Sequence, residues 1–266
     1  MINALSIAGS DSCGGAGIQA DIKAFSANGV YGMSVITAIT AQNTQGVFGI
    51  QDISPEMIKK QIEVIFEDIE VNAVKIGMVS KCESIKAIGD SLRAIENLPP
   101  VVLDPVMISK SGFKLLSEDA KETLIKELIP LADLITPNLP EAEELLNREI
   151  INIEDMKQAA IDLKKMGPKA VLVKGGHLKD KATDLLYDGE KFYIFPQERI
   201  DTTHTHGTGC TLSSTIAANL AKGLTMKEAV TESKKYITLA IEHGFKLGKG
   251  VGPTHHFYEL YKKSGM

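Results

Sequence analysis

Short runs of apolar residues recur along the chain, each bounded by Gly, Pro, Asp, Asn or another polar residue. Runs of this length between turn-forming residues are typical of β-strands. Most of them are apolar throughout, without alternating polar positions, so we expect strands buried on both faces, as in a parallel sheet. The predicted strands are Ala4–Ala8, Ser34–Thr40, Ala73–Ile76, Val101–Leu103, Leu134–Thr136 and Ala170–Val173.

Segments with helical spacing of their apolar residues lie between these runs. One follows Pro55 and another precedes Gly167-Pro168, residues that commonly begin or end a helix. A turn sequence, Tyr187-Asp188-Gly189-Glu190, separates two further short runs and predicts a hairpin that adds antiparallel strands. The predicted helices are 58–69, 156–166, 210–222 and 226 to about 245, and the hairpin strands are 183–186 and 191–195.

This alternation of strands and helices predicts a three-layer α/β/α sandwich with a mostly parallel central sheet. No linker, repeat or low-complexity segment interrupts it, so we expect residues 1–266 to form a single domain. In such folds a ligand binds at the carboxyl ends of the parallel strands. The polar residues that follow the strands are therefore the candidates for function.

Composition narrows the class of partner. The chain carries a net charge of −5 with scattered lysines, which argues against a nucleic-acid surface. Its three cysteines are widely spaced and give neither a disulfide framework nor a zinc motif. The N-terminus lacks a basic segment before its apolar residues, and no apolar run approaches the length of a membrane span. We expect a soluble, cytoplasmic protein that acts on a small molecule, with no nucleic acid or membrane as partner.

A glycine-rich turn, Gly207-Thr208-Gly209-Cys210, runs directly into a predicted helix. Glycines beside a helix N-terminus let several backbone N–H groups converge, and the helix dipole favours an anion there. Cys210 falls in the first turn, a position that lowers the pKa of a thiol, so a thiolate able to accept a proton is one interpretation. A tight loop with a small buried cysteine is the other.

A second glycine motif lies near the N-terminus. Gly15-Ala16-Gly17-Ile18-Gln19-Ala20 matches the G-x-G-x-x-A dinucleotide fingerprint between a strand and a helix, which makes a dehydrogenase an alternative. The next predicted strand ends in Thr40-Ala41-Gln42-Asn43-Thr44, without the acidic residue that binds a ribose. No G-x-x-x-x-G-K-[ST] loop occurs either. The turn at 207–210 is therefore the better phosphate site.

Four polar residues follow other predicted strands: Asp104, Asn138 with Glu141, and Lys174. One or two carboxylates with phosphate oxygens and water suit Mg²⁺, so Asp104 and Glu141 are candidate ligands, and Lys174 can neutralise phosphate charge. Singly, each has an ordinary structural explanation: a turn, a helix-terminal carboxylate or a solvated strand end. Together with the glycine-rich helix terminus they favour a phosphotransferase.

Several motifs, in order along essentially the whole chain, resemble the hydroxymethylpyrimidine/phosphomethylpyrimidine kinases of thiamine synthesis. That family has the ribokinase-like fold and uses ATP and Mg²⁺. The resemblance implies two phosphorylations, first of 4-amino-5-hydroxymethyl-2-methylpyrimidine and then of its monophosphate, by a homodimer. The motifs are Ile7–Asp11, Gly14–Asp21, Ala41–Thr44, Lys75–Met78, Leu103–Met107, Thr136–Ala142, Val173–His177, Thr205–Thr211 and Gly250–His256.

The resemblance also implies roles for individual residues. Gln42 matches the residue that binds the aminopyrimidine edge, a task that suits an amide because it both donates and accepts hydrogen bonds. Cys210 matches the position of the aspartate base in other ribokinase-like enzymes, and His204 stands where Asn is expected. The remaining assignments are Gly9, Asp21 and Val106 for the substrate pocket, Gly207, Thr208 and Gly209 for the anion hole, and Asn138 and Glu141 for magnesium and phosphates.

A pyridoxal or pyridoxine kinase is the alternative, since some vitamin B6 kinases resemble the same family and carry a thiol in this turn. Gln42-Asn43-Thr44, Lys75–Met78, Lys110-Ser111-Gly112 and Gly176-His177 favour the thiamine branch.

Overall fold

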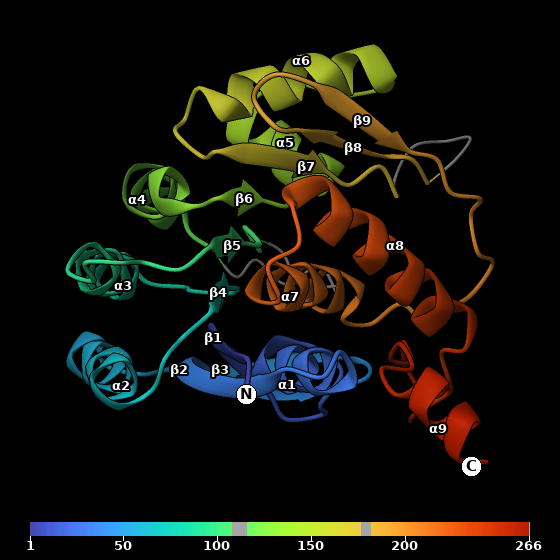
Figure 1. Cartoon of the computed structure of the whole chain (residues 1–266), viewed down its shortest axis with the longest axis horizontal. Helices are drawn as coiled ribbons and strands as arrows, with labels where there is room; N and C mark the ends of the chain where they lie inside the picture. Colours follow the sequence, from blue (N-terminus) through green and yellow to red (C-terminus); the bar gives the residue numbers. More distant parts are fainter. Residues whose placement is uncertain (108–115, 177–181, 266) are drawn as a thin grey trace.

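One nine-stranded sheet forms the centre of the computed structural model, which describes residues 1–107, 116–176 and 182–265. The strand order is β3-β2-β1-β4-β5-β6-β7-β8-β9, parallel from β2 to β7, with antiparallel β3 at one edge and β8 and β9 at the other (Figure 1). The strands are β1 Asn3–Asp11, β2 Tyr31–Asn43, β3 Gly46–Asp52, β4 Ala73–Ile76, β5 Val101–Leu103, β6 Leu134–Ile135, β7 Ala170–Val173, β8 Asp184–Tyr187 and β9 Phe192–Phe195.

Helices cover both faces of the sheet (Figure 1). One face packs against α2 to α6 through one apolar cluster, and the other packs against α1, α7 and α8 through a second. The helices are α1 Gly17–Ala27, α2 Pro55–Asp68, α3 Cys82–Arg93, α4 Glu118–Glu127, α5 Leu139–Leu146, α6 Ile153–Lys164, α7 Thr208–Ala221, α8 Met226–Glu242 and α9 Tyr258–Ser264, with a short 3₁₀ turn at Ile129–Leu131.

The strands serve both clusters because successive side chains point to opposite faces. In β5, Val101 and Leu103 pack on the α2–α6 side and Val102 packs on the α7 side, all fully buried. This explains the continuously apolar strands and confirms the predicted α/β fold with a mostly parallel sheet.

The predicted strands, the hairpin and the four predicted helices all appear, with small shifts at their ends. Strand β3 was not predicted: Gly46–Asp52 has no apolar run, and it forms by antiparallel pairing with β2. Within the described ranges, no helix is both long and apolar enough to cross a membrane.

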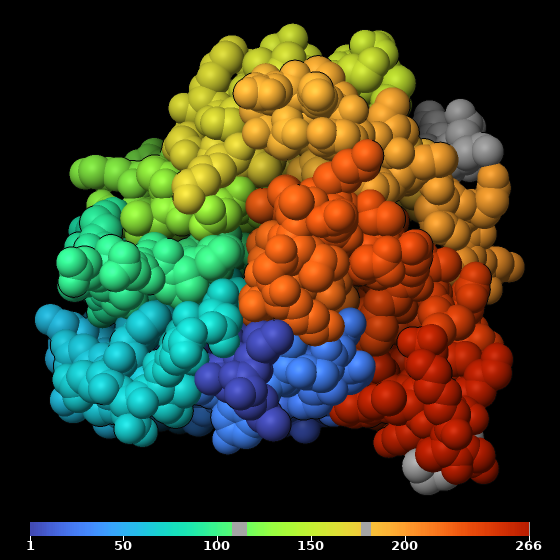
Figure 2. All heavy atoms as spheres, in the orientation of Figure 1, coloured from blue at the N-terminus to red at the C-terminus, as the bar shows by residue number. Residues whose placement is uncertain are grey.

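Segments far apart in the sequence meet in this fold. Figure 2 shows the orange and red C-terminal part packed directly against the blue N-terminal part. Helix α7 lies against α1 and also against β1, β4 and β5. Its N-terminus therefore lies among the carboxyl ends of the central strands.

Candidate active site

A cavity of about 760 Å³ opens at the carboxyl edge of the parallel strands. Its walls come from the ends of β1, β2, β5 and β7, the turn before α7, and the side of α8. This is the edge at which ligands bind in open α/β sheets. Predicted site residues that line it are Gly9, Gln42, Asp104, Val106, Asn138, Glu141, Lys174, Gly207, Thr208, Gly209 and Cys210.

The turn before α7 is held in one conformation. Gly207 has φ of +78°, and a Cβ there would lie 1.8 Å from the carbonyl oxygen of Gly15, so only glycine fits. Thr208 Oγ1 donates to the carbonyl of Thr205 at 2.9 Å. The helix begins at Thr208, and residues of its first turn line the cavity, an arrangement in which unpaired N–H groups favour an anion.

Two buried ion pairs lie around this turn. Lys75 Nζ lies 2.9 Å from both carboxylate oxygens of Asp21, and both side chains are fully buried. Lys174 Nζ donates to Asp104 Oδ1 at 2.9 Å, and Thr136 Oγ1 donates to the same oxygen at 3.2 Å. Burial would raise the pKa of the Asp104 carboxyl, but Lys174 and Lys75 lower it, so Asp104 is ionised.

Gly209 brings the helix terminus close to the second pair. A Cβ at this position would lie 3.4 Å from Lys174 Nζ and 3.4 Å from Asp104 Oδ2. A lysine, a carboxylate and a helix N-terminus thus converge on one point of the cavity. Such a combination neutralises phosphate charge directly and through a bridging cation.

The structure corrects the expected pKa of Cys210. Burial raises the pKa of the thiol to about 11, although Lys75 and the backbone N–H of Gly17 lower it; Asp21 and Asp104 add to the rise. The helix N-terminus does not outweigh this desolvation, because the thiol also faces two carboxylates. Cys210 is a protonated thiol at neutral pH.

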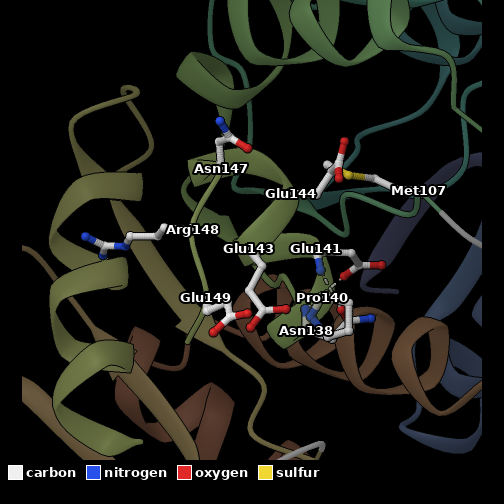
Figure 3. A pocket seen from close by; sticks show the side chains of 9 residues that line it. All are labelled: Met107, Asn138, Pro140, Glu141, Glu143, Glu144, Asn147, Arg148 and Glu149. Atoms are coloured by element: carbon white, nitrogen blue, oxygen red, sulfur yellow. Dashed lines mark hydrogen bonds between the residues drawn. The ribbon is translucent and has the colours of Figure 1, made fainter. Parts of the chain in front are cut away.

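Asn138 and Glu141 form a capping box at the start of α5. Asn138 Oδ1 accepts from the Glu141 N–H at 2.9 Å, and Glu141 Oε2 accepts from the Asn138 N–H at 2.8 Å. One Glu141 oxygen, Oε2, therefore has the ordinary structural role of a helix-terminal carboxylate. Glu141 also lies between the main cavity and a neighbouring acidic pocket along α5 (Figure 3).

Glu141 and Asp104 together suit a magnesium ion. Burial raises the pKa of the Glu141 carboxyl to about 7; Lys174 opposes this rise and Asp104 adds to it. A cation between the two carboxylates would relieve their repulsion, and Mg²⁺ needs few protein ligands when phosphates and water supply the others.

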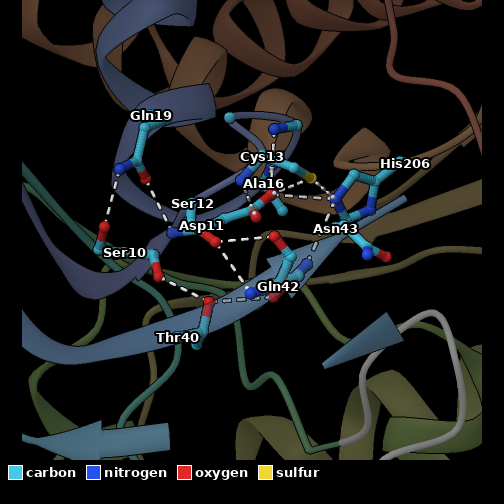
Figure 4. Close-up of polar contacts among 12 residues, drawn as sticks. Ser10, Asp11, Ser12, Cys13, Ala16, Gln19, Thr40, Gln42, Asn43 and His206 are labelled. Atoms are coloured by element: carbon cyan, nitrogen blue, oxygen red, sulfur yellow. Dashed lines mark hydrogen bonds and ion pairs between the residues drawn. The ribbon is translucent and has the colours of Figure 1, made fainter. Parts of the chain in front are cut away.

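Gln42, near the end of β2, also lines the cavity, and Figure 4 shows its polar contacts. The Gln42 N–H donates to Ser12 Oγ at 2.8 Å, and the Ser12 hydroxyl donates back to the Gln42 carbonyl at 2.7 Å. The side-chain amide lies between Thr40 Oγ1, at 3.3 Å, and His206 Nε2, at 3.4 Å. Val106 and Gly9 line the same cavity, as the resemblance implies.

One pair of residues beside Gln42 was missed from the sequence. His206 Nε2 lies 3.0 Å from Asp11 Oδ2, which also accepts from the N–H groups of Gly15 and Ala16. Burial would raise the pKa of the Asp11 carboxyl, but the hydrogen bonds from His206, Ala16 and Cys13 lower it to about 2. Because Asp11 is ionised, His206 Nε2 carries the proton that it donates to Asp11.

A family model described as phosphomethylpyrimidine kinase matches residues 11–255. The chain belongs to this family. A hydroxymethylpyrimidine/phosphomethylpyrimidine kinase of Rhizobium meliloti (strain 1021) is 54 % identical over 263 residues, covering 97 % of this chain and 98 % of that protein.

Two solved structures share the fold of this phosphomethylpyrimidine kinase family member. The crystal structure of phosphomethylpyrimidine kinase from Clostridium difficile 630 has a TM-score of 0.82 at 55 % identity, covering 91 % of this chain and 100 % of that chain. Pyridoxal kinase from Bacillus subtilis, solved as an ADP complex, has a TM-score of 0.89 at 41 % identity, covering 98 % and 99 %.

Asp21, which the resemblance assigns to the substrate pocket, is fully buried in this kinase family member and is not among the residues that line the cavity. Both oxygens are used internally: besides Lys75, the Ser6 hydroxyl donates to Oδ2 at 2.6 Å and the Ser214 hydroxyl donates to Oδ1 at 2.7 Å. Asp21 instead fixes Lys75, which does line the cavity. The sequence signal for this pair was Lys75, a charged residue within the otherwise apolar strand β4.

The glycines of the apparent dinucleotide fingerprint have a packing role. A Cβ at Gly15 would lie 2.2 Å from Cδ2 of His206, and Gly17 has φ of +55° with its Cβ position 2.3 Å from the carbonyl oxygen of Gly9. They allow the loop after β1 to contact the turn before α7. The match to the phosphomethylpyrimidine kinase family shows that the dehydrogenase interpretation is wrong.

His204, the departure from the family motif, lies outside the cavity lining. Its ring packs against Gly252, where a Cβ would lie 2.3 Å from Nδ1, and Nδ1 is buried without a hydrogen-bond partner. The motif residues 110–112 and His177 lie outside the described residues.

Proposed function

We propose that this chain transfers the γ-phosphoryl group of ATP to the hydroxymethyl group of 4-amino-5-hydroxymethyl-2-methylpyrimidine, and then a second phosphoryl group to the resulting monophosphate. One observation carries this proposal: a single cavity joins Gln42, the candidate reader of the aminopyrimidine, to the N-terminus of α7. The cavity also extends to β8 and α8, where Asp184, Lys234 and Ile237 line it. We assign the nucleotide to this part of the cavity.

In the first step the substrate hydroxyl oxygen bonds to the γ-phosphorus as the bond from that phosphorus to the ADP oxygen breaks. Phosphoryl transfer passes through a loose transition state, so the hydroxyl proton leaves late, and we propose that it passes to a phosphoryl oxygen. Lys174 and the N–H groups of Gly207, Thr208 and Gly209 stabilise the charge on the transferred group. Cys210, as a protonated thiol, donates a hydrogen bond to that group.

In the second step the nucleophile is a phosphate oxygen that already carries negative charge, so no proton has to be removed. The same anion site serves it. Asp104 and Glu141 would hold Mg²⁺, with Asn138 fixing Glu141 through the capping box. When bound, Mg²⁺ neutralises charge on the phosphates of ATP.

ADP release in a coupled assay tests the activity. We expect turnover with the hydroxymethylpyrimidine and, separately, with its monophosphate, and we expect Lys174→Ala to lose both, which excludes a contaminating kinase. Pyridoxal is the third substrate, because the likeness to the Bacillus subtilis pyridoxal kinase favours vitamin B6 phosphorylation as a second candidate. A higher kcat/KM for pyridoxal than for the hydroxymethylpyrimidine would make that candidate the main activity.

We also propose that residues 1–266 form one catalytic domain, that it acts as a homodimer, and that it works in the cytoplasm without a nucleic-acid or membrane partner. The single-domain proposal is supported by one sheet whose strands contribute residues to both apolar clusters. Sedimentation equilibrium of the purified protein measures the oligomeric state, and a mass near 28.7 kDa would contradict the dimer.

A further inference from the structure

Three potential metal ligands of different chemistry meet beside Gln42 (Figure 4). His206 Nε2 lies 3.0 Å from Asp11 Oδ2, Cys13 Sγ lies 3.4 Å from the same oxygen, and Cys13 Sγ lies 3.8 Å from His206 Nε2. Among the described residues, these are the three His, Cys, Asp or Glu side chains whose ligand atoms approach one another closely enough for one ion. Their role in the kinase reaction is indirect, so the cluster needs its own explanation.

The three distances match a zinc site. Atoms with these separations lie on a circle of radius about 2.0 Å, so an ion about 0.7 Å out of their plane would lie about 2.1 Å from each, against about 2.0–2.3 Å for zinc bonds to N, O and S. An ion placed there lies about 45° away from the line joining His206 Nε2 to Asp11 Oδ2, so the imidazole has to rotate until its lone pair points at the ion. The angles at the ion would be about 91°, 107° and 128°, a distorted form of three corners of a tetrahedron.

The donor set has the chemistry that Zn²⁺ prefers. One thiolate, one imidazole and one carboxylate are all common zinc ligands, and the two anionic ligands balance the charge of the ion. The Asp11 carboxylate is already fixed, because Oδ2 accepts from the N–H groups of Gly15 and Ala16 and Oδ1 accepts from that of Cys13. Outer-shell hydrogen bonds of this kind orient metal ligands.

We propose that Asp11 Oδ2, Cys13 Sγ and His206 Nε2 form a binding site for one Zn²⁺ ion in the cavity wall. On binding, the Cys13 thiol releases its proton to solvent, and the imidazole proton moves from Nε2 to Nδ1, leaving the Nε2 lone pair for the metal. The ion replaces the hydrogen bond between His206 and Asp11. No electron transfer is involved.

Gln42 adjoins the proposed site, since its side-chain Nε2 lies 3.4 Å from His206 Nε2, so its amide is the nearby group that could supply a fourth ligand. Occupation of the site would draw the amide oxygen of Gln42 toward the ion and away from a bound pyrimidine. Zn²⁺ therefore weakens substrate binding, and by linkage the substrate weakens Zn²⁺ binding. This consequence rests on the proposed function, whereas the site itself does not.

Co²⁺ substitution tests the site without reference to activity. Titration of the full-length protein with Co²⁺ should give tetrahedral ligand-field bands and a thiolate-to-cobalt charge-transfer band at one equivalent, and Zn²⁺ should displace both. Cys13→Ser should abolish the charge-transfer band, whereas the matched control Cys82→Ser should keep it. Absence of the band from the native protein, or its survival in folded Cys13→Ser, overturns the site; circular dichroism and thermal melting verify folding.

Kinetics with free Zn²⁺ fixed by a metal buffer test the coupling. We expect Zn²⁺ to raise the KM for the hydroxymethylpyrimidine by about 5-fold or more in the native protein, and to leave the KM of Cys13→Ser nearly unchanged. Zn²⁺ that binds with an unchanged KM overturns the coupling. Failure of the proposed kinase activity is distinguishable, because the cobalt spectrum does not depend on turnover.

Discussion

The role of Cys210 is open to a direct test, because a protonated donor and a thiolate base respond differently to pH and to substitution. Burial raises the pKa of the thiol to about 11. At pH 8 about one molecule in a thousand would carry the thiolate, a population cost of about 4 kcal/mol, since each pH unit corresponds to 1.36 kcal/mol. We therefore expect Cys210 to act as a hydrogen-bond donor.

Cys210→Ala and Cys210→Ser separate the two roles. Loss of a hydrogen bond to a charged group costs about 1.5–3 kcal/mol, so Cys210→Ala should lower kcat by about 10- to 100-fold. Cys210→Ser keeps a donor of similar size and should retain most of the rate. Because neither step needs the thiol as a base, the alanine substitution should slow both phosphorylations to a similar extent.

The assay measures ADP release from pH 6.5 to 9, with the alcohol and with the monophosphate as separate substrates. Lys174→Ala is the reference for a group needed in both steps. If Cys210 were a thiolate base, the first-step rate would instead rise tenfold per pH unit. Cys210→Ala and Cys210→Ser would then both slow the first step alone, by about 10²–10⁴-fold. That result would refute the donor role and restore Cys210 as the general base.

Four further predictions concern binding, metal use and stability. Gln42→Leu should weaken hydroxymethylpyrimidine binding by about 1–3 kcal/mol, since a polar edge of the ligand loses its partner; unchanged affinity by calorimetry would remove Gln42 from the site. Glu141→Gln should raise the Mg²⁺ concentration needed for half-maximal turnover, because the capping geometry is kept while a carboxylate charge is lost; an unchanged requirement would leave only the capping role. Lys75→Met should cost about 3–5 kcal/mol in the free energy of unfolding by urea, because the buried Asp21 carboxylate loses its counterion, and adding Asp21→Asn should restore part of it; no recovery in the double variant would contradict this cause. Burial, with Lys23 and then His255 adding to it, lowers the pKa of His256 from 6.5 to about 4, so the unfolded chain takes up a proton first as pH falls. The contribution of His256 to the free energy of unfolding is full above pH 6.5 and falls by about 3 kcal/mol by pH 4. In urea unfolding measured across this pH range, His256→Gln should reduce the dependence of that free energy on pH. An unchanged dependence would assign the loss to other groups.

Local sequence pattern was enough to predict the elements and the edge of the sheet at which the candidate site lies. Strands such as Ala73–Ile76 and Val101–Leu103 were predicted with the bounds that the structure gives, because a buried strand needs an apolar run and ends where polar residues begin. The positions of Asp104, Lys174 and the turn before α7 followed, since parallel strands and the helices after them share one carboxyl edge.

Which side chains meet, and in which protonation state, depends on the folded arrangement of the chain. Strand β3 has too little apolar character to be predicted from its own sequence, and its antiparallel hydrogen bonds with β2 stabilise it. Asp11 and His206 are 195 positions apart, and nothing local in either segment indicates their contact. The motif placed Cys210 at a helix N-terminus, where a thiol pKa falls, yet burial beside Asp21 and Asp104 raises it. Local pattern predicts most of the secondary structure, whereas pairing of a weakly apolar strand, side-chain contacts and pKa values depend on neighbours that folding brings together.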